Sequence, residues 1–542
     1  GQIRAILEKE NAVCSLIITS KIRHTRSNDL KEINGNIYTV GLTESEDFPT
    51  DSGIPSNVGH GFIAAFDSFT GELEKTIVLG EGSELNCLDV NSQAGFTGSS
   101  LGLFVGGEVE NPSYNVEISS LWAFHDSSFN GGTSDGLIAR YSFDLEEEWS
   151  SFFGGNDMDI VVDIEISDSD GKIFIAGNTN TKSYSLIDCG VPNDSGFPNC
   201  NPTGSSQFDF SNGASVGLGQ DVFLAEFSSQ GELNWSTFFG GQFSEIISTS
   251  SSISIHENKL SVIGYSNFLN NLPSNTGGGF QLSGISEGYF LAEFESRTLS
   301  WKTSFGCNED EAFFPLNHSN VAYDGNGVLY FSGSTLCSTG SDTDDYCSVP
   351  DADHFPLCPG SFNGFFEPTH FGFTDIFIGA LGVNKNLVYS TFLGGENNDL
   401  VSCQTVKDGS LYLGGRTGSV EYFPVRFPLG AYEQSEAFGI DGITMKLNNQ
   451  GIIHVNNFEE KGKGVIVYPN PSSGNTIMVE FDCRSLTGKH LPFRLFSAEG
   501  KLMQSSITAT EIGSYKVNVS NFPPGVYYIV STVGSARFIK MN

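Results

Sequence analysis

The stretch from Gln220 to Gly241, QDVFLAEFSSQGELNWSTFFGG, decides the fold because copies of it recur along most of the chain. Its first half, VFLAEF, is apolar at most positions, and the pair Gln230-Gly231 predicts a tight turn. Its second half, WSTFF, ends at a Gly-Gly pair. This pattern is typical of a β-hairpin. The chain is therefore predicted to be built from repeated hairpins.

Each hairpin is followed by two more short apolar segments, the second of which has the form GKIFIAGNT at Gly171 to Thr179. Four strands per copy is the content of one propeller blade, which packs between two neighbouring blades. We count five complete copies and two half-copies, one at each end of the array. Joining the two halves predicts six blades, closed by N- and C-terminal strands. Seven blades is the alternative if Ile3 to Ile22 supplies further strands.

The composition supports an all-β protein that does not bind nucleic acid. Among 542 residues there are 64 Gly and 45 Phe but only five Met, which favours strands and tight turns over helices. No apolar run approaches the roughly 20 residues of a membrane-spanning helix. The net charge of -37 disfavours a polyanionic partner, because phosphate binding needs a basic surface.

The repeats resemble a family of bacterial β-propeller repeats, the SBBP-like repeats. The resemblance covers about Glu32 to Phe458 and is carried by DVFLAEF, WSTFFGG, GNIYTVGLT and SEDFP. It implies a propeller and no particular chemistry. The copy at Phe62 to Gly82 departs most, because it lacks both the Trp and the Gly-Gly pair.

The composition changes after Phe458. The last 84 residues hold nine basic and six acidic residues, whereas the preceding part is strongly acidic. We predict a propeller at 1–458, a polar linker at 459–464 and a separate module at 465–542. Six or seven short alternating segments in that module predict a small Ig-like β-sandwich.

The C-terminal module resembles the type A C-terminal sorting domain of the type IX secretion system of Bacteroidetes. The residues that carry the resemblance are Tyr468, Pro469, Asn470, Pro471, Gly474, Gly513, Gly525, Tyr527 and Lys540. The resemblance implies that the type IX secretion machinery is a partner of this module. It also implies that the protein is secreted or held at the outer-membrane cell surface.

Five cysteines lie close together in polar loops and are candidates for disulfides in an exported protein. They are Cys189, Cys200, Cys337, Cys347 and Cys358. Their spacing leaves the connectivity open. Cys87, Cys403 and Cys483 lie in apolar segments and are equally compatible with buried thiols.

The sequence contains one weak candidate for a metal site and none for a catalytic or cofactor site. The candidate is an acidic insertion with Asp342, Asp344, Asp345, Asp351 and Asp353, whose oxygens could hold Ca²⁺. It lacks the spacing of an EF-hand, so a solvated acidic loop is the favoured interpretation. The repeated aromatic residues could stack on sugars, but packing between blades is favoured. These residues are Trp149, Trp235, Trp301 and Tyr389.

The favoured function is an exported, non-enzymatic module that binds an unknown glycan or protein through loops on a rigid ring. The first alternative is a secreted polysaccharide hydrolase or lyase with its site in the propeller channel. The second is a structural surface component. A hydrolase needs paired carboxylates in one pocket. We expect no convergent acidic pair with a basic or aromatic partner at the channel mouth. Finding such a cluster would favour the hydrolase.

Overall fold

The structure is a computed structural model of the chain. It describes residues 25–45, 48–50, 59–68, 70–91, 102–117, 123–182, 189, 196–201, 219–273, 277–282, 284–307, 318–337, 347, 354–359, 365–407, 409–419, 423, 441–448, 465–468, 474–481, 493–497, 503, 507–511, 514–531 and 534–541. In these residues it contains strands and one short 3-10 helix, η1 (Leu269–Asn271). None of the described helical residues forms a span that is long and apolar enough to cross a membrane. The chain divides into two compact units, Gly1–Pro424 with Ala437–Ile452 and Val425–Glu436 with Ile453–Asn542.

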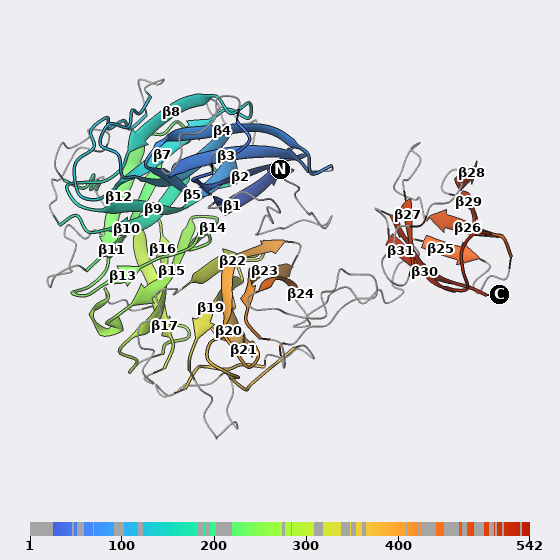
Figure 1. The fold of residues 1–542 in the computed structure, drawn as a ribbon. Coiled ribbons are helices and arrows are strands. Elements are labelled where there is room, and N and C mark those ends of the chain that lie inside the picture. The colour runs from blue at the N-terminus through green and yellow to red at the C-terminus, as the bar shows by residue number, and fades with distance from the viewer. Residues whose placement is uncertain are drawn as a thin grey trace. The chain divides into compact units, whose positions relative to one another are not determined.

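The first unit contains six antiparallel sheets arranged as the blades of a β-propeller (Figure 1). Blade 1 contains β1 (Thr25–Ile33), β2 (Asn36–Thr43), β3 (His60–Asp67) and β4 (Leu73–Glu81). Blade 2 contains β5 (Ser83–Asn91), β6 (Gly102–Val109), β7 (Asp135–Tyr141) and β8 (Glu147–Phe152). Blade 3 contains β9 (Asp159–Ile166), β10 (Ile173–Thr179), β11 (Asp221–Phe227) and β12 (Leu233–Phe239).

Blades 4 to 6 continue in the same order along the chain. Blade 4 contains β13 (Glu245–Ile246), β14 (Ile253–His256), β15 (Lys259–Ser266), β16 (Gly288–Glu295) and β17 (Thr298–Phe305). Blade 5 contains β18 (Ser319–Tyr323), β19 (Leu329–Thr335), β20 (Asp375–Leu381) and β21 (Leu387–Leu393). Blade 6 contains β22 (Asp399–Lys407), β23 (Ser410–Thr417) and β24 (Asp441–Asn448).

The six-blade arrangement is confirmed, but the grouping of strands into blades differs from the prediction. β1 to β4 form a complete sheet by themselves, and among the described strands none of blade 1 pairs with a strand of blade 6. The predicted composite blade is therefore wrong for this part of the chain. The reason is that each long insertion joins two paired strands of one sheet, such as β10 and β11. The short link after the Gly-Gly pair leads to the next blade. Ile3 to Ile22, which could have supplied a seventh blade, lies outside the described residues.

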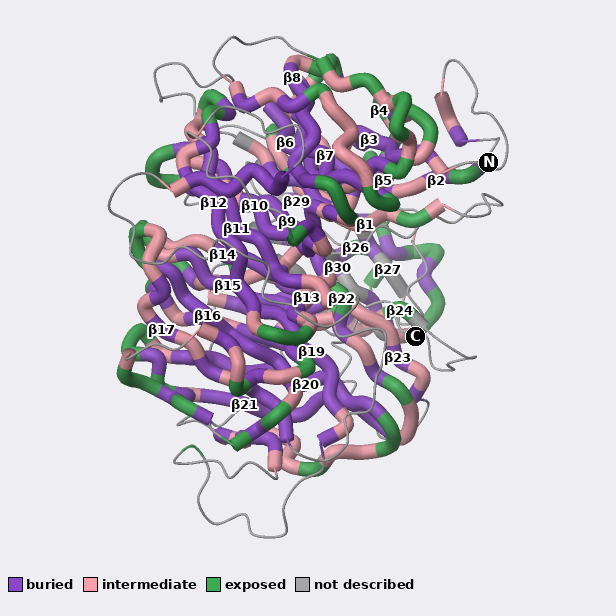
Figure 2. The backbone as a smooth tube through the Cα atoms, turned by 90° about the vertical axis from the view of Figure 1, so that its left-hand side faces the viewer, coloured by how far each residue is buried: buried purple, intermediate pink, exposed green. Residues whose placement is uncertain are grey.

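The core lies between neighbouring blades. Every residue of β11 is buried, and β12 and β21 are buried except at one position each. Trp149, Trp235, Trp301 and Tyr389 are all buried, which agrees with a packing role. Figure 2 shows the buried residues along the strands of the ring and exposed residues mainly at turns. β4 is different, because Leu79 is its one buried residue.

The Gly-Gly pair has a structural role at the boundary between blades. Its second glycine donates its N–H to the acidic residue at the start of the next blade: Gly155 to Asp159 (2.7 Å), Gly241 to Glu245 (2.7 Å) and Gly395 to Asp399 (2.8 Å). Its first glycine leaves room for acidic side chains. A Cβ on Gly154 would lie 2.7 Å from Asp159 Oδ2 and 2.9 Å from Asp135 Oδ1. A larger residue would therefore displace this carboxyl pair.

The second unit is a sandwich of two antiparallel sheets. One sheet contains β25 (Val465–Tyr468), β26 (Thr476–Phe481), β29 (Ser514–Asn518) and β28 (Ile507–Glu511). The other contains β27 (Phe493–Ser497), β30 (Gly525–Ser531) and β31 (Gly534–Lys540). Side chains from both sheets form its core, including Val479, Val517 and Ile529. The predicted linker at 459–464 lies outside the described residues, so its boundaries remain a prediction.

Candidate functional site

Acidic residues and a lysine converge on the inner strands of blades 1 to 3. Lys31 Nζ of β1 lies 3.2 Å from Asp89 Oδ1 of β5. Asp29 and Glu165 contribute to the electrostatic environment of the same lysine. The Lys31 side chain is 38% exposed, whereas Asp89 is buried. The expectation that no acidic pair converges with a basic or aromatic partner at the channel mouth stays a prediction, because these contacts lie along the inner strands.

Backbone amides explain why three aspartates lie on these inner strands. Each carboxylate accepts one N–H from the following residue and one from the next blade. The contacts between blades are Leu88 N–H to Asp29 (2.8 Å), Ile166 N–H to Asp89 (2.7 Å) and Ile253 N–H to Asp163 (2.7 Å). Buried carboxylates held by amides in this way join adjacent blades. Their primary role is therefore structural.

Glu165 is held differently, because in the described part of the chain no backbone amide donates to it. Burial raises the pKa of Glu165 to about 8, and Lys31 opposes this effect. Burial also raises the pKa of Asp29 to about 7. Carboxyl groups that titrate near neutral pH can act as general acids. The arrangement therefore contains the residue types that acid-base chemistry requires.

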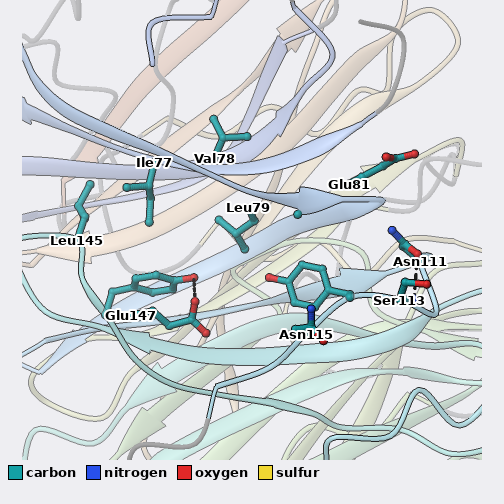
Figure 3. A pocket seen from close by; sticks show the side chains of 12 residues that line it. Ile77, Val78, Leu79, Glu81, Asn111, Ser113, Asn115, Leu145 and Glu147 are labelled. Carbon is teal, nitrogen blue, oxygen red and sulfur yellow. Dashed lines mark hydrogen bonds between the residues drawn. The ribbon is translucent and has the colours of Figure 1, made fainter. Parts of the chain in front are cut away.

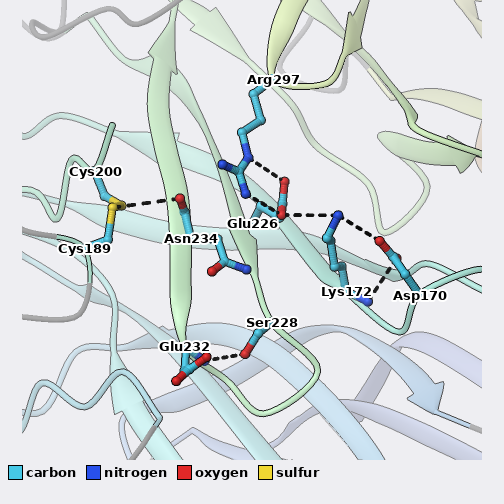
Figure 4. A network of polar contacts seen from close by, with 9 residues as sticks. All are labelled: Asp170, Lys172, Cys189, Cys200, Glu226, Ser228, Glu232, Asn234 and Arg297. Atoms are coloured by element: carbon cyan, nitrogen blue, oxygen red, sulfur yellow. Dashed lines mark hydrogen bonds and ion pairs between the residues drawn. A yellow bond between two sulfur atoms is a disulfide. The ribbon is translucent and has the colours of Figure 1, made fainter. Parts of the chain in front are cut away.

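The buried carboxylates Glu226 and Glu293 form ion pairs that connect consecutive blades. The Arg297 guanidinium, in the turn after β16, donates to Glu226 of β11 at 2.9 and 2.8 Å (Figure 4). The Lys172 ammonium lies 3.7 Å from the same carboxylate and 2.7 Å from Asp170. In the next pair of blades, Lys385 forms the equivalent ion pair with Glu293. These ion pairs hold neighbouring blades together. Glu226 contacts both Arg297 and Lys172.

Three disulfides hold loops on the ring. Cys189 is bonded to Cys200, Cys347 to Cys358, and Cys337 to Cys307. The sequence analysis did not include Cys307, whose partner lies 30 residues away. Cys87 is a buried thiol, and burial raises its pKa. Cys483 lies outside the described residues.

Within the residues that the structure describes, no group of three or more His, Cys, Asp or Glu side chains could hold a metal ion. The predicted Ca²⁺ ligands Asp342, Asp344, Asp345, Asp351 and Asp353 all lie outside these residues. The calcium site therefore stays a prediction.

A pocket lies where blade 1 meets blade 2. Its volume is 470 Å³, and it is lined by residues of β4, of the segment 111–115 and of the β7–β8 hairpin. In Figure 3, Leu145 and Glu147 lie at one end, and Glu81 and Asn111 lie at the other. The repeat that departs most from the sequence pattern, Phe62 to Gly82, thus forms one wall of this pocket.

The lining of this pocket combines aromatic, amide and carboxylate groups. The Tyr141 hydroxyl donates to Glu147 Oε2 at 3.4 Å (Figure 3). Tyr114 packs edge-on against Phe152, and burial raises its pKa. The lining includes Glu81 and Glu147 but no Lys or Arg. The pocket is therefore suited to a ligand that donates hydrogen bonds or carries positive charge.

In the C-terminal sandwich, two of the predicted signature residues contact each other. Lys540 is 8% exposed, and its Nζ donates to the carbonyl of Gly474 at 3.0 Å. Tyr527 is buried, and its hydroxyl donates to the Pro523 carbonyl at 2.6 Å. Tyr468 ends β25 and Gly525 begins β30. The other signature residues lie outside the described part: Pro469, Asn470, Pro471 and Gly513.

Residues 466–540 match the family described as the secretion system C-terminal sorting domain. The protein is secreted through the type IX secretion system. The sorting domain makes the machinery of that system its partner and places the mature protein outside the cell or at its surface. The similarity of the ring to the SBBP-like repeats stays a prediction.

Curated proteins gave no match to this chain. Among solved structures, the chain is similar to the β-propeller domain of the Trilobed protease from Pyrococcus furiosus. That match has 9% identity and a TM-score of 0.32, and it covers 85% of this chain and 90% of that chain. It is also similar to the phage phi92 endosialidase, with 10% identity, a TM-score of 0.33 and coverage of 95% and 84%. These similarities carry no functional argument.

Proposed function

We propose that the propeller is a non-enzymatic module that binds a glycan or a protein outside the cell. The observation that carries this proposal is the 470 Å³ pocket between blades 1 and 2. It combines tyrosines, amides and carboxylates on a rigid ring, which is a common composition for a recognition site. The sorting domain delivers this site to the medium or to the cell surface.

The proposal is tested by applying the purified full-length chain to glycan and protein arrays. A specific hit should be lost in Glu147→Lys, because Glu147 lines the pocket. Glu146→Lys makes the same charge change at an exposed neighbour outside the pocket and serves as the matched control. A chain that binds nothing on either array, or binds equally well with both variants, would contradict the proposal.

A second candidate function is hydrolysis or elimination of a polysaccharide at the inner-strand cluster. The convergence of Asp29, Lys31, Asp89 and Glu165 favours it. Glu165 would act as the general acid, because its pKa is raised to about 8. The test is release of reducing ends or unsaturated products from a polysaccharide panel, comparing wild type with Glu165→Gln. Activity that survives unchanged in Glu165→Gln would remove this candidate.

The role of the sorting domain is tested separately from ligand binding. Deleting residues 465–542 should leave the propeller inside the cell envelope, as measured by fractionation of the native host. Intact-mass analysis of protein from the cell surface shows whether the domain is removed after export. Export that continues without these residues would contradict the assigned role.

A further inference from the structure

Two neighbouring loops meet in the same way at several blade boundaries. One loop follows the Gly-Gly pair, and the other follows the strand that pairs with the innermost strand of the next blade, such as β10 or β23. In blade 3 the Asp157 N–H donates to Thr181 Oγ1 at 3.1 Å and so joins the two loops. In blade 6 the equivalent bond runs from the Asn397 N–H to Ser419 Oγ at 2.9 Å. Small polar residues therefore suffice to build the ring at this position.

Blade 4 has two phenylalanines at these positions. Phe243 is the second residue after the Gly-Gly pair, which is the place of Asp157 and Asn397. Phe268 is the second residue after Ser266, whose hydroxyl accepts the Phe268 N–H at 3.0 Å. A threonine hydroxyl accepts the corresponding N–H in blades 3 and 6. The two phenylalanine rings have their centroids 5.0 Å apart and are tilted by 46°. Blade 4 thus has an aromatic pair where its sister blades have a polar contact.

This aromatic pair reaches the solvent. Phe243 is 42% exposed, and Phe268 is half-buried. An exposed ring gives up the stabilisation that burial of its apolar surface would supply. Since the sister blades build the same loops without aromatic residues, packing of the ring does not account for the pair. Adjoining exposed apolar side chains on a soluble protein often mark a binding site.

Backbone contacts hold both rings in place. Ser244 follows Phe243, and its carbonyl accepts the Asn267 N–H at 3.1 Å. Phe268 follows Asn267 and precedes Leu269, which is buried at the start of η1. The two loops are therefore tied to each other and to the core directly beside the rings. A surface that is already ordered loses little conformational entropy when it binds a ligand.

The side chains next to the rings carry amide groups. The Asn271 amide donates to Gln242 Oε1 at 3.3 Å and bridges the same two loops. Gln242, Asn267 and Asn270 are exposed. Amides both donate and accept hydrogen bonds, as sugar hydroxyls do. The negative face of an aromatic ring attracts C–H groups such as those on one face of a sugar ring. The combination of rings and amides therefore fits a neutral sugar.

We propose that Phe243 and Phe268 form a stacking platform for a neutral oligosaccharide. The sugars that fit have equatorial hydroxyl groups, because their C–H groups then form an apolar face that can lie on an aromatic ring. The amides of Gln242 and Asn270 bond to hydroxyl groups at the edge of the stacked sugar. None of the described residues that line the pocket between blades 1 and 2 belongs to this platform. The inference therefore adds a second site to the function proposed above.

The experiment measures binding of cellohexaose, a glucose oligosaccharide of this geometry, to the full-length chain by isothermal titration calorimetry. The test variant combines Phe243→Asn with Phe268→Ser and so installs the pair of blade 6, which is compatible with the fold. It should weaken binding about tenfold. Phe373→Asn removes a ring that is 65% exposed elsewhere and should change the affinity less than about twofold. Thermal melts establish that the variants remain folded, and Phe243→Asn alone gives the same test if the double variant does not.

A wild-type chain that does not bind cellohexaose, or a test variant that binds it as well as Phe373→Asn does, would overturn the inference. Binding that is lost in Glu147→Lys but kept in the test variant would mean that the pocket holds the sugar. In that case the platform fails while the proposed function stands. Self-association of the chain that the test variant abolishes, without sugar binding, would assign the two rings to a contact between copies and overturn the inference as well.

Discussion

The boundary between blades 1 and 2 and the boundary between blades 2 and 3 are built at equivalent positions from different chemistry. Between blades 2 and 3, Asp135 and Asp159 form a buried acidic pair against Gly154. Between blades 1 and 2, His60 and Ser83 take the two acidic positions. The Ser83 hydroxyl accepts the Gly61 N–H at 3.0 Å. A tightly packed boundary is thus replaced by one that leaves a pocket.

In this ring, the repeat whose sequence departs most from the others is also the one that borders the pocket. Repeated residues in this ring serve packing, because every blade needs the same contacts. The blade that lacks the Trp and the Gly-Gly pair also borders the pocket. Loss of a structural motif at one boundary is therefore a guide to function there.

The largest expected effect is the loss of stability when a glycine at each boundary is replaced by a larger residue. Gly154→Val should destabilise the protein by about 4 kcal/mol, because the side chain would displace a buried carboxyl pair. Gly80→Val meets only the Tyr114 ring and should cost about 1 kcal/mol. Urea unfolding measures both. Gly325→Val, where nothing lies within 4 Å, is the control. Equal losses at Gly154 and Gly80 would break the comparison.

Removing an ion pair from the boundary between blades 3 and 4 should cost more stability than removing one from the boundary between blades 1 and 2. Arg297→Met leaves the buried Glu226 carboxylate with reduced compensation and should cost about 3 kcal/mol. Arg26→Met removes an exposed pair with Glu84 between blades 1 and 2 and should cost less than about 0.5 kcal/mol. Chemical denaturation of the two variants tests this difference. A larger loss for Arg26→Met would contradict it.

The acidic boundary should make stability depend on pH. Burial raises the pKa of Asp135 to about 8 and that of Asp159 to about 7. Between about pH 4 and pH 8 the folded state therefore binds more protons than the unfolded state, so the free energy of unfolding falls as pH rises. Asp135→Asn should reduce this slope by at most about 1.4 kcal/mol per pH unit. Unfolding curves at pH 5, 6, 7 and 8 measure the slope. An unchanged slope in the variant would contradict the assignment.

A further small effect is expected at the boundary beside the pocket. Ser83→Ala removes the acceptor of the Gly61 N–H and should cost about 1 kcal/mol. Ligand binding to the pocket should persist, because Ser83 does not line it. Calorimetry and binding on the glycan and protein arrays test these two statements. Loss of binding with no loss of stability would show that Ser83 belongs to the site.

The sequence was informative about the strands because alternation and turn residues act locally. It predicted the six blades and the sandwich, and the sorting signature was recognisable from residues such as Gly474 and Lys540. It misassigned the blade boundaries, because a long insertion can join two paired strands as well as two blades. The bond between Cys307 and Cys337 was missed because a 30-residue separation carries no local signal.

The candidate sites were harder to predict because they depend on contacts between blades. Asp89 and Glu165 are far from Lys31 in sequence, and only the packing of blades 1 to 3 against one another brings them near it. The pocket likewise needs β4 of one blade and Tyr141 of the next. The sequence did show which repeat was unusual, and that clue would have located one wall of the pocket.

The grouping of strands has a consequence for how the chain reaches its final form. In the described part of the propeller, each sheet is made from consecutive strands of the sequence, so a blade does not wait for a distant terminus before it pairs. Contacts of short sequence separation form quickly, which limits the time during which aggregation-prone folding intermediates are exposed. A protein that must cross an envelope before it works can thus mature blade by blade, in the order in which it is synthesised.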